Sequence, residues 1–261
     1  MRYHLFSFVA ALVIALLNFF VLHSFQIANP IMISSCTFFF AYFAYSIDHY
    51  FDGSKHQNTE LHERHKVSNR GFSFASKGFA LTAVASAYFF YHMPTPFFIS
   101  GVVLAIFSGI YFLLIYKKLI ESRFKMVCAA VILSLVIAIW IFMDLDLSSI
   151  AIKLGYLSIV ALAIFSNLRF FAWVDFDYDK KWFSTLVKAP ISKQKMAITQ
   201  GFLVTIIYLL GFIVGRGQTW MFVPLAYCLL SIFIDKKNLT GNIARVMLDL
   251  TMLLPLLRWF W

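Results

Sequence analysis

Apolar residues occur in long uninterrupted blocks along the chain, and short polar stretches separate these blocks. The blocks span residues 5–23, 27–47, 78–93, 97–116, 124–143, 147–168, 198–215, 219–234 and 242–260. About 20 apolar residues in an α-helix cross the hydrocarbon core of a bilayer. The pattern therefore predicts an all-α fold, a polytopic membrane bundle of about nine transmembrane helices.

The composition supports this class of protein. Of the 261 residues, 61% are hydrophobic and only 13% are charged, and 31 are phenylalanine, which is far from the composition of soluble globular domains. No low-complexity tract or linker divides the chain, so residues 1–261 are expected to form a single transmembrane domain. The first apolar block lacks an Ala-x-Ala cleavage site and is expected to be retained as a helix.

Positive charges indicate how the predicted helices are oriented. With a cytoplasmic N-terminus, all but three of the 22 Lys and Arg residues fall on the inner side of the membrane; the exceptions are Lys153, Arg216 and Arg258. The same topology places Asp144, Asp146 and the C-terminus on the outer side. The net charge of +10 is explained by this asymmetry, and no nucleic-acid partner is expected. A bacterial inner membrane is the expected location.

Two clusters of aspartates stand where apolar blocks give way to the long inner loops predicted at 48–74 and 173–196. Asp48 and Asp52 are four residues apart, and so are Asp175 and Asp179, with Asp177 between them. On a helix this spacing places both carboxylates on one face, about 6 Å apart at Cβ. Proteins usually bind Mg²⁺ through one or two carboxylates together with substrate phosphates. The clusters therefore predict a site for magnesium and a diphosphate.

Basic and amide side chains near the clusters could bind the phosphates. Asn167 and Arg169 precede the second cluster by one or two helical turns and are expected to line the cavity that holds the predicted site. Lysine and arginine stabilise the charge that develops on a departing diphosphate. The basic residues available for this are Arg64, Lys66, Arg70, Lys117, Lys118, Arg123, Lys180 and Lys181.

The first cluster resembles a motif of the UbiA-type intramembrane prenyltransferase family, which reads N-D-x-x-D-x-x-x-D. Within "DHYFDGSKH", Asp48 stands at the Asn of the motif, His49 at the first Asp, Asp52 at the second and His56 at the third. The family variant N-D-Y-F-D matches "DHYFD" at its last three letters.

The second cluster resembles the second motif of the same family, roughly D-x-x-D-x-E-G-D. In "AWVDFDYD", Ala172 stands at the first Asp, Asp175 at the next, Asp177 at the Glu, Tyr178 at the Gly and Asp179 at the last Asp. The stretch "KKWFSTL" that follows is similar to a family segment with Lys and then Thr-Leu. The resemblance covers the whole predicted topology.

The resemblance implies a helical barrel around a central cavity that is open to lipid. A prenyl diphosphate would bind at its cytoplasmic end, ionise with the help of Mg²⁺, and pass its prenyl group to an aromatic or other lipophilic acceptor. Catalysis is then expected from Asp48, Asp52, Asp175 and Asp179, and metal binding from these four and Asp177. Substrate binding is expected from His49, Tyr50, Arg64, Lys66, Arg70, Lys117, Lys118, Arg123, Asn167, Lys180 and Lys181.

Two other functions are compatible with the same residues. The histidines at two acid positions and the alanine at a third favour a non-catalytic membrane protein that binds a prenyl lipid on the same fold. A transporter that relays cations through the acids is a further alternative, but the acids stand at helix ends rather than near the middle of the membrane. The three cysteines lie inside apolar blocks without metal-ligand spacing and are expected to pack against neighbouring helices.

Overall fold

The computed structural model describes residues 4–54, short pieces between 84 and 92, and residues 95–117, 122–142, 149–174, 192–234 and 242–260. Every element in these ranges is a helix, and none of the described residues belongs to a strand. The all-α prediction is therefore confirmed for the described part of the chain. Contacts between residues divide the chain into two compact units, Met1–Ile99 and Ser100–Trp261. Each unit is described by itself below.

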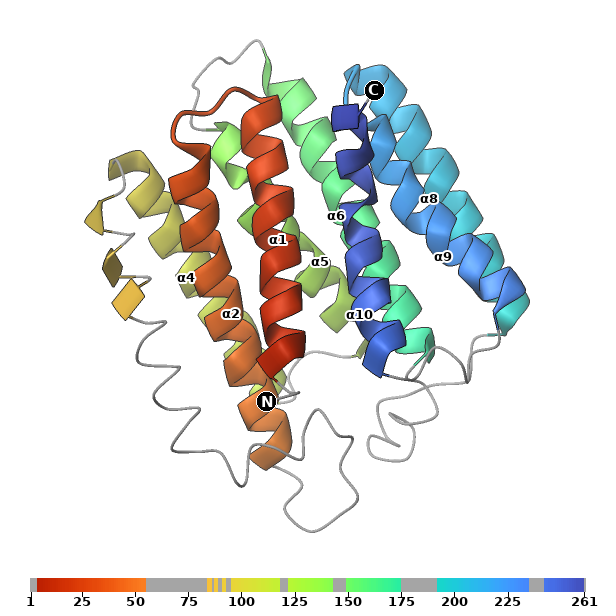
Figure 1. Ribbon diagram of the computed structural model, residues 1–261, viewed down its shortest axis with the longest axis horizontal. Helices are drawn as coiled ribbons and strands as arrows, with labels where there is room; N and C mark the ends of the chain where they lie inside the picture. Colours follow the sequence, from red (N-terminus) through yellow and green to blue (C-terminus); the bar gives the residue numbers. More distant parts are fainter. Residues whose placement is uncertain are drawn as a thin grey trace. The chain divides into compact units, whose positions relative to one another are not determined.

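The first unit contains a hairpin of two long helices, α1 (His4–Ser24) and α2 (Pro30–Ser54), which pack along each other (Figure 1). Two left-handed residues shape the connection, Gln26 with φ 55° and Asn29 with φ 56°. Asparagine adopts this conformation more readily than most residues because its short side chain bonds locally. Pro30 then opens α2, and its fixed φ suits the first position of a helix.

A buried polar cluster holds this hairpin together. Asn18 on α1 is fully buried, and its Oδ1 atom accepts hydrogen bonds from Ser34 Oγ at 3.0 Å and Thr37 Oγ1 at 3.3 Å on α2. A buried amide oxygen that lost these donors would pay its desolvation cost without compensation. The cluster therefore favours one register of α1 against α2.

The second unit is built around α6 (Ile150–Val174). This helix packs against α5 (Ser122–Ala138), α8 (Lys193–Val214) and α9 (Phe222–Phe233), and α8 packs against α9 (Figure 1). The other elements are α4 (Thr95–Tyr116, which crosses the boundary between the units), η1 (Ile139–Phe142), η3 (Gln218–Met221), α10 (Asn242–Leu250) and η5 (Thr251–Phe260).

Helices α6 and α8 run antiparallel. Ser166 near the end of α6 contacts Gln200 near the start of α8, and Gly155 near the start of α6 lies against Val214 at the end of α8. Local signals mark both ends of α8. Ser192 Oγ accepts a hydrogen bond from the Lys195 N–H at 3.2 Å, and Gly215 follows the helix with φ 70°.

The described helices follow the predicted apolar blocks, but two of them continue farther toward the acidic clusters. Helix α2 runs to Ser54, so Asp48 and Asp52 lie within a helix rather than at the start of a loop. Helix α6 ends at Val174, and α8 begins at Lys193. Backbone hydrogen bonds can continue a helix through polar residues. A helix end predicted from hydropathy alone therefore falls too early in the sequence. Most of the block at 78–93 lies outside the described residues.

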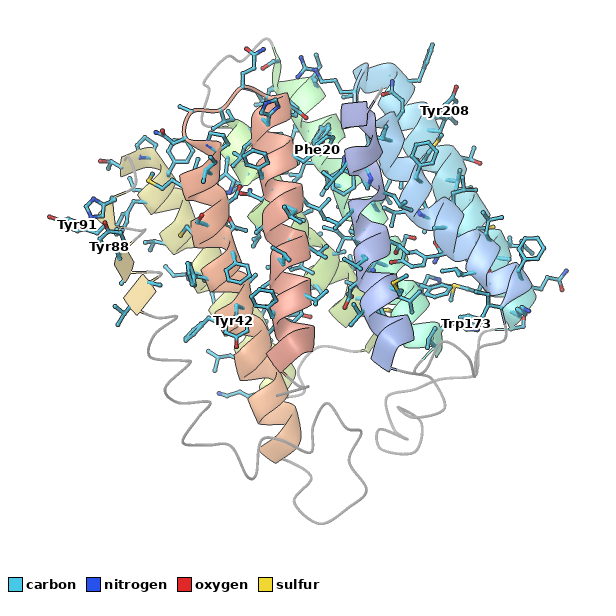
Figure 2. The ribbon with its side chains drawn as sticks, viewed as in Figure 1. Phe20, Tyr42, Tyr88, Tyr91, Trp173 and Tyr208 are labelled. Atoms are coloured by element: carbon cyan, nitrogen blue, oxygen red, sulfur yellow. The ribbon has the colours of Figure 1, made fainter. Side chains whose placement is uncertain are left out.

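Two of the described helices, α6 and α8, are long and apolar enough to cross a membrane. Helix α8 also exposes large apolar side chains along its length, among them Tyr208 on its outer edge (Figure 2). Contiguous exposed apolar surface marks a contact with lipid or with another protein. These features support association with a membrane. The exposed apolar side chains of α8 are Ile198, Phe202, Tyr208, Leu209, Phe212 and Ile213.

Candidate functional site

The first acidic cluster lies in the last two turns of α2. The backbone is helical from Asp48 to Asp52, and His49 and Tyr50 belong to the same turn. Because α2 continues to Ser54, the two aspartates have i, i+4 helical spacing, which places them on one face of the helix. The side chains of residues 46–54 lie outside the described part of the structure.

The second acidic cluster begins directly after α6. Val174, the last residue of this helix, is buried, and Asp175 follows it in the sequence. Lys117 is exposed just after α4, where its backbone N–H donates to Leu113 O at 2.9 Å. Arg123 lies in the first turn of α5, with its side chain outside the described residues. The predicted residues that lie wholly outside them are Arg64, Lys66, Arg70, Lys118, Asp175, Asp177, Asp179, Lys180 and Lys181.

The magnesium prediction concerns acids whose side chains are not described. Among the described residues, no three His, Cys, Asp or Glu side chains come together in a way that could hold a metal ion. The predicted ligands are carboxylates, and hard oxygen donors of this kind fit Mg²⁺. The metal site therefore stays a prediction from the sequence.

Asn167 belongs to a buried hydrogen-bond network that the sequence did not predict. Its Nδ2 group donates to the hydroxyl of Tyr227 on α9 at 2.5 Å, and Tyr227 Oη donates to Leu248 O on α10 at 3.0 Å. Thr251 Oγ1 lies 2.6 Å from both Tyr227 Oη and Leu248 O. Tyr227 is fully buried, so its hydroxyl connects three segments of the second unit. The contact of Asn167 with a substrate stays a prediction.

Aromatic side chains surround this network near the end of α6. The ring of Phe170 stacks on Tyr227 with centroids 4.6 Å apart, and its centroid lies 5.5 Å from that of Trp173. Phe170 and Trp173 are both buried, and Trp173 lies at the end of α6 (Figure 2). Packing and hydrogen bonds therefore anchor the last turns of α6 against α9, immediately before the second acidic cluster.

A second polar contact joins α6 to α8. Ser166 Oγ lies 2.5 Å from Gln200 Oε1, and Gln200 Nε2 donates to Ser166 O at 3.2 Å and contacts Met196 Sδ at 3.6 Å. Ser166, Gln200 and Met196 are fully buried. Gln200 and Tyr227 both stand inside predicted apolar blocks. Polar side chains in a membrane-spanning helix usually face the interior of the bundle, so their presence in these blocks was a sequence signal for buried contacts.

Replacing Tyr227 with phenylalanine should destabilise the second unit. The substitution keeps the ring that stacks on Phe170 but leaves the half-buried Asn167 amide without its acceptor, at a cost of about 1–3 kcal/mol. Thermal unfolding of the purified protein in detergent would measure this loss. The matched control is Tyr208→Phe on the exposed face of α8, which should leave the unfolding midpoint unchanged. Equal midpoints for both variants would show that the network contributes no stability.

Comparison of the chain with models of protein families, with curated proteins and with solved structures finds no match.

Proposed function

We propose that the chain is an intramembrane prenyltransferase of the UbiA type. The observation that carries this proposal is that the two acidic clusters stand at the ends of long apolar stretches and that basic residues follow each of them. Support comes from α2, whose helix continues through Asp48 and Asp52, and from α6, which ends one residue before Asp175.

The proposal includes the membrane topology predicted from the sequence. Nine helices cross the membrane, with the N-terminus in the cytoplasm and the C-terminus on the outer side of a bacterial inner membrane. Both acidic clusters then belong to the inner side, where most of the lysines and arginines lie. The exposed apolar face of α8 would contact lipid in this arrangement.

The proposed reaction transfers a prenyl group from its diphosphate to a lipophilic acceptor. The C1–O bond breaks, and its electron pair leaves with the diphosphate. The acceptor then forms a new bond to C1 and releases a proton. Magnesium would be held by Asp48, Asp52, Asp175, Asp177 and Asp179, and it would supply positive charge to the departing diphosphate.

The chain's own basic residues add to this stabilisation. Arg64, Lys66 and Arg70 follow the first cluster in the sequence, and Lys180 and Lys181 follow the second. Lys117 is exposed after α4 and can reach an anionic group in solvent, whereas Asn167 already donates to Tyr227 inside the second unit. A fixed positive charge near the leaving group lowers the barrier because charge develops there in the transition state.

A non-catalytic protein that binds a prenyl lipid is the second candidate. His49 and His56 replace two acids of the first family motif, and Ala172 replaces one acid of the second. Ala172 lies within α6. Fewer carboxylates would weaken magnesium binding while preserving a cavity for the prenyl chain. Binding of a prenyl diphosphate without its consumption would distinguish this function from transfer.

Isothermal titration of the purified protein with prenyl diphosphates tests the proposal. Geranyl, farnesyl and geranylgeranyl diphosphate are each titrated with Mg²⁺ and with a chelator. We expect at least one of them to bind, and binding to weaken when magnesium is removed because the carboxylates then repel the diphosphate. The Asp52→Ala/Asp179→Ala double variant should lose the magnesium-dependent part of the binding.

Two results would contradict the proposal. One is the absence of binding by all three diphosphates in both conditions. The other is equal binding by the wild type and the double variant at every magnesium concentration, which would exclude the acidic clusters as metal ligands.

A further inference from the structure

A charged side chain lies inside the C-terminal half of α6. Arg169 has a buried Nε atom, and this atom has no hydrogen-bond partner in the structure as far as it is described. An arginine side chain carries a positive charge and five N–H donors, and it has no acceptor. Buried donors in native proteins nearly always have a hydrogen-bond partner, so a donor without one needs an explanation such as a bound ion or ligand.

The neighbouring polar side chains bond to one another rather than to Arg169. Asn167, two residues earlier, donates to Tyr227. Ser166, one turn earlier on the same face of the helix, pairs with Gln200. Asn167 and Ser166 therefore make these contacts with Tyr227 and Gln200, and neither contact involves a carboxylate or the guanidinium.

Arg169 is also placed where a ligand from the membrane surface can reach it. It stands five residues before the end of α6, which corresponds to about 7–8 Å along the helix axis. The residue as a whole is half-buried, so part of its side chain remains accessible although Nε is buried. In a membrane-spanning helix, a charged residue near the end faces the protein interior or the interface.

We infer that Arg169 binds a phosphate-bearing anion. The guanidinium can present Nε–H and an Nη–H side by side, a geometry that matches two oxygens of a phosphate. A prenyl diphosphate and the head group of an anionic phospholipid share this chemistry. The inference deepens the proposed function, and it rests on that function only where the ligand is the prenyl diphosphate.

Binding of inorganic pyrophosphate without metal tests this site. Full-length wild type, Arg169→Gln, Arg169→Lys and Arg216→Gln are titrated in detergent with a chelator present. Losing a charge-assisted contact should weaken binding about ten- to a hundredfold in Arg169→Gln. Arg169→Lys should show a smaller loss because it keeps the charge but not the paired donors. Arg216 is exposed after α8, so Arg216→Gln should bind like the wild type.

A second arm identifies the source of the phosphate. The same proteins are purified from bilayer nanodiscs that contain phosphatidylglycerol, and native mass spectrometry counts the phosphatidylglycerol molecules retained. Loss of one lipid in Arg169→Gln, with unchanged pyrophosphate binding, assigns the site to a phospholipid head group. Weaker pyrophosphate binding with unchanged lipid retention assigns it to the diphosphate.

The inference is overturned if Arg169→Gln binds pyrophosphate and retains phosphatidylglycerol as the wild type does. If Arg169→Gln does not fold, the Arg169→Lys variant decides the question. A folded Arg169→Lys protein that binds pyrophosphate and retains phosphatidylglycerol as the wild type does would also overturn the inference. Neither arm contains magnesium or a prenyl chain. A failure of prenyl transfer therefore leaves these results intact, and the two failures can be told apart.

Discussion

Replacing Asp52 or Asp175 with alanine should reduce prenyl transfer by about two to three orders of magnitude, the range found when one electrostatic stabiliser of a transition state is removed. Each substitution takes one carboxylate from the proposed magnesium site, so less positive charge opposes the diphosphate as it leaves. Turnover of a labelled prenyl diphosphate in membranes, with a panel of aromatic acceptors, measures the effect.

The matched control for this pair is Asp146→Ala. Asp146 is also an aspartate beside an apolar block, but the predicted topology places it on the outer side. The Asp146→Ala variant should therefore transfer the prenyl group at the wild-type rate. Membrane insertion of all three variants should be normal, because the acids stand at the ends of apolar blocks rather than within them. Wild-type turnover by both Asp52→Ala and Asp175→Ala would rule out the proposed catalytic role.

The second large effect is expected at Gly211 in α8. A Cβ atom at this position would lie 2.9 Å from both the backbone N and Cα of Gln218, which begins η3. Backbone cannot move aside as a flexible side chain can, so Gly211→Ala should separate the end of α8 from η3. The expected cost is about 1–3 kcal/mol, as for other overpacked sites.

Gly201 in the same helix provides the opposite case. A Cβ atom at Gly201 would meet no atom within 4 Å, so Gly201→Ala should keep or raise stability, by up to about 1 kcal/mol from the better helix propensity of alanine. Thermal unfolding in detergent compares the two variants directly. A lower midpoint for Gly211→Ala and an equal or higher one for Gly201→Ala is expected. Midpoints that shift together would argue against the close approach of η3.

The positions of the helices were largely determined by the sequence. The apolar block 5–23 coincides with α1, and the block 198–215 covers most of α8, because the backbone hydrogen bonds of a helix join residues close in sequence. The ends of α2 and α6 near the acids were less predictable. Helical hydrogen bonding continues into polar sequence, whereas hydropathy stops at the first charged residues.

Part of the candidate site was also available from the sequence. The i, i+4 spacing of Asp48 and Asp52 needs only a helix, and α2 supplies one through Ser54. The sequence also indicated that Asn167 and Arg169 belong to the region before the second cluster. It did not indicate their surroundings, since many polar residues in other blocks were equally suitable partners.

Only the tertiary structure decided those surroundings. Asn167 and Tyr227 are 60 residues apart in the chain, and Ser166 and Gln200 are 34 apart. Gly211 lies against the start of η3 because the chain turns back after α8. The burial of Arg169 Nε likewise depends on how neighbouring elements pack around α6. Apolar patterning acts locally and sets where helices form, whereas the choice of partners depends on packing between segments that no local pattern encodes.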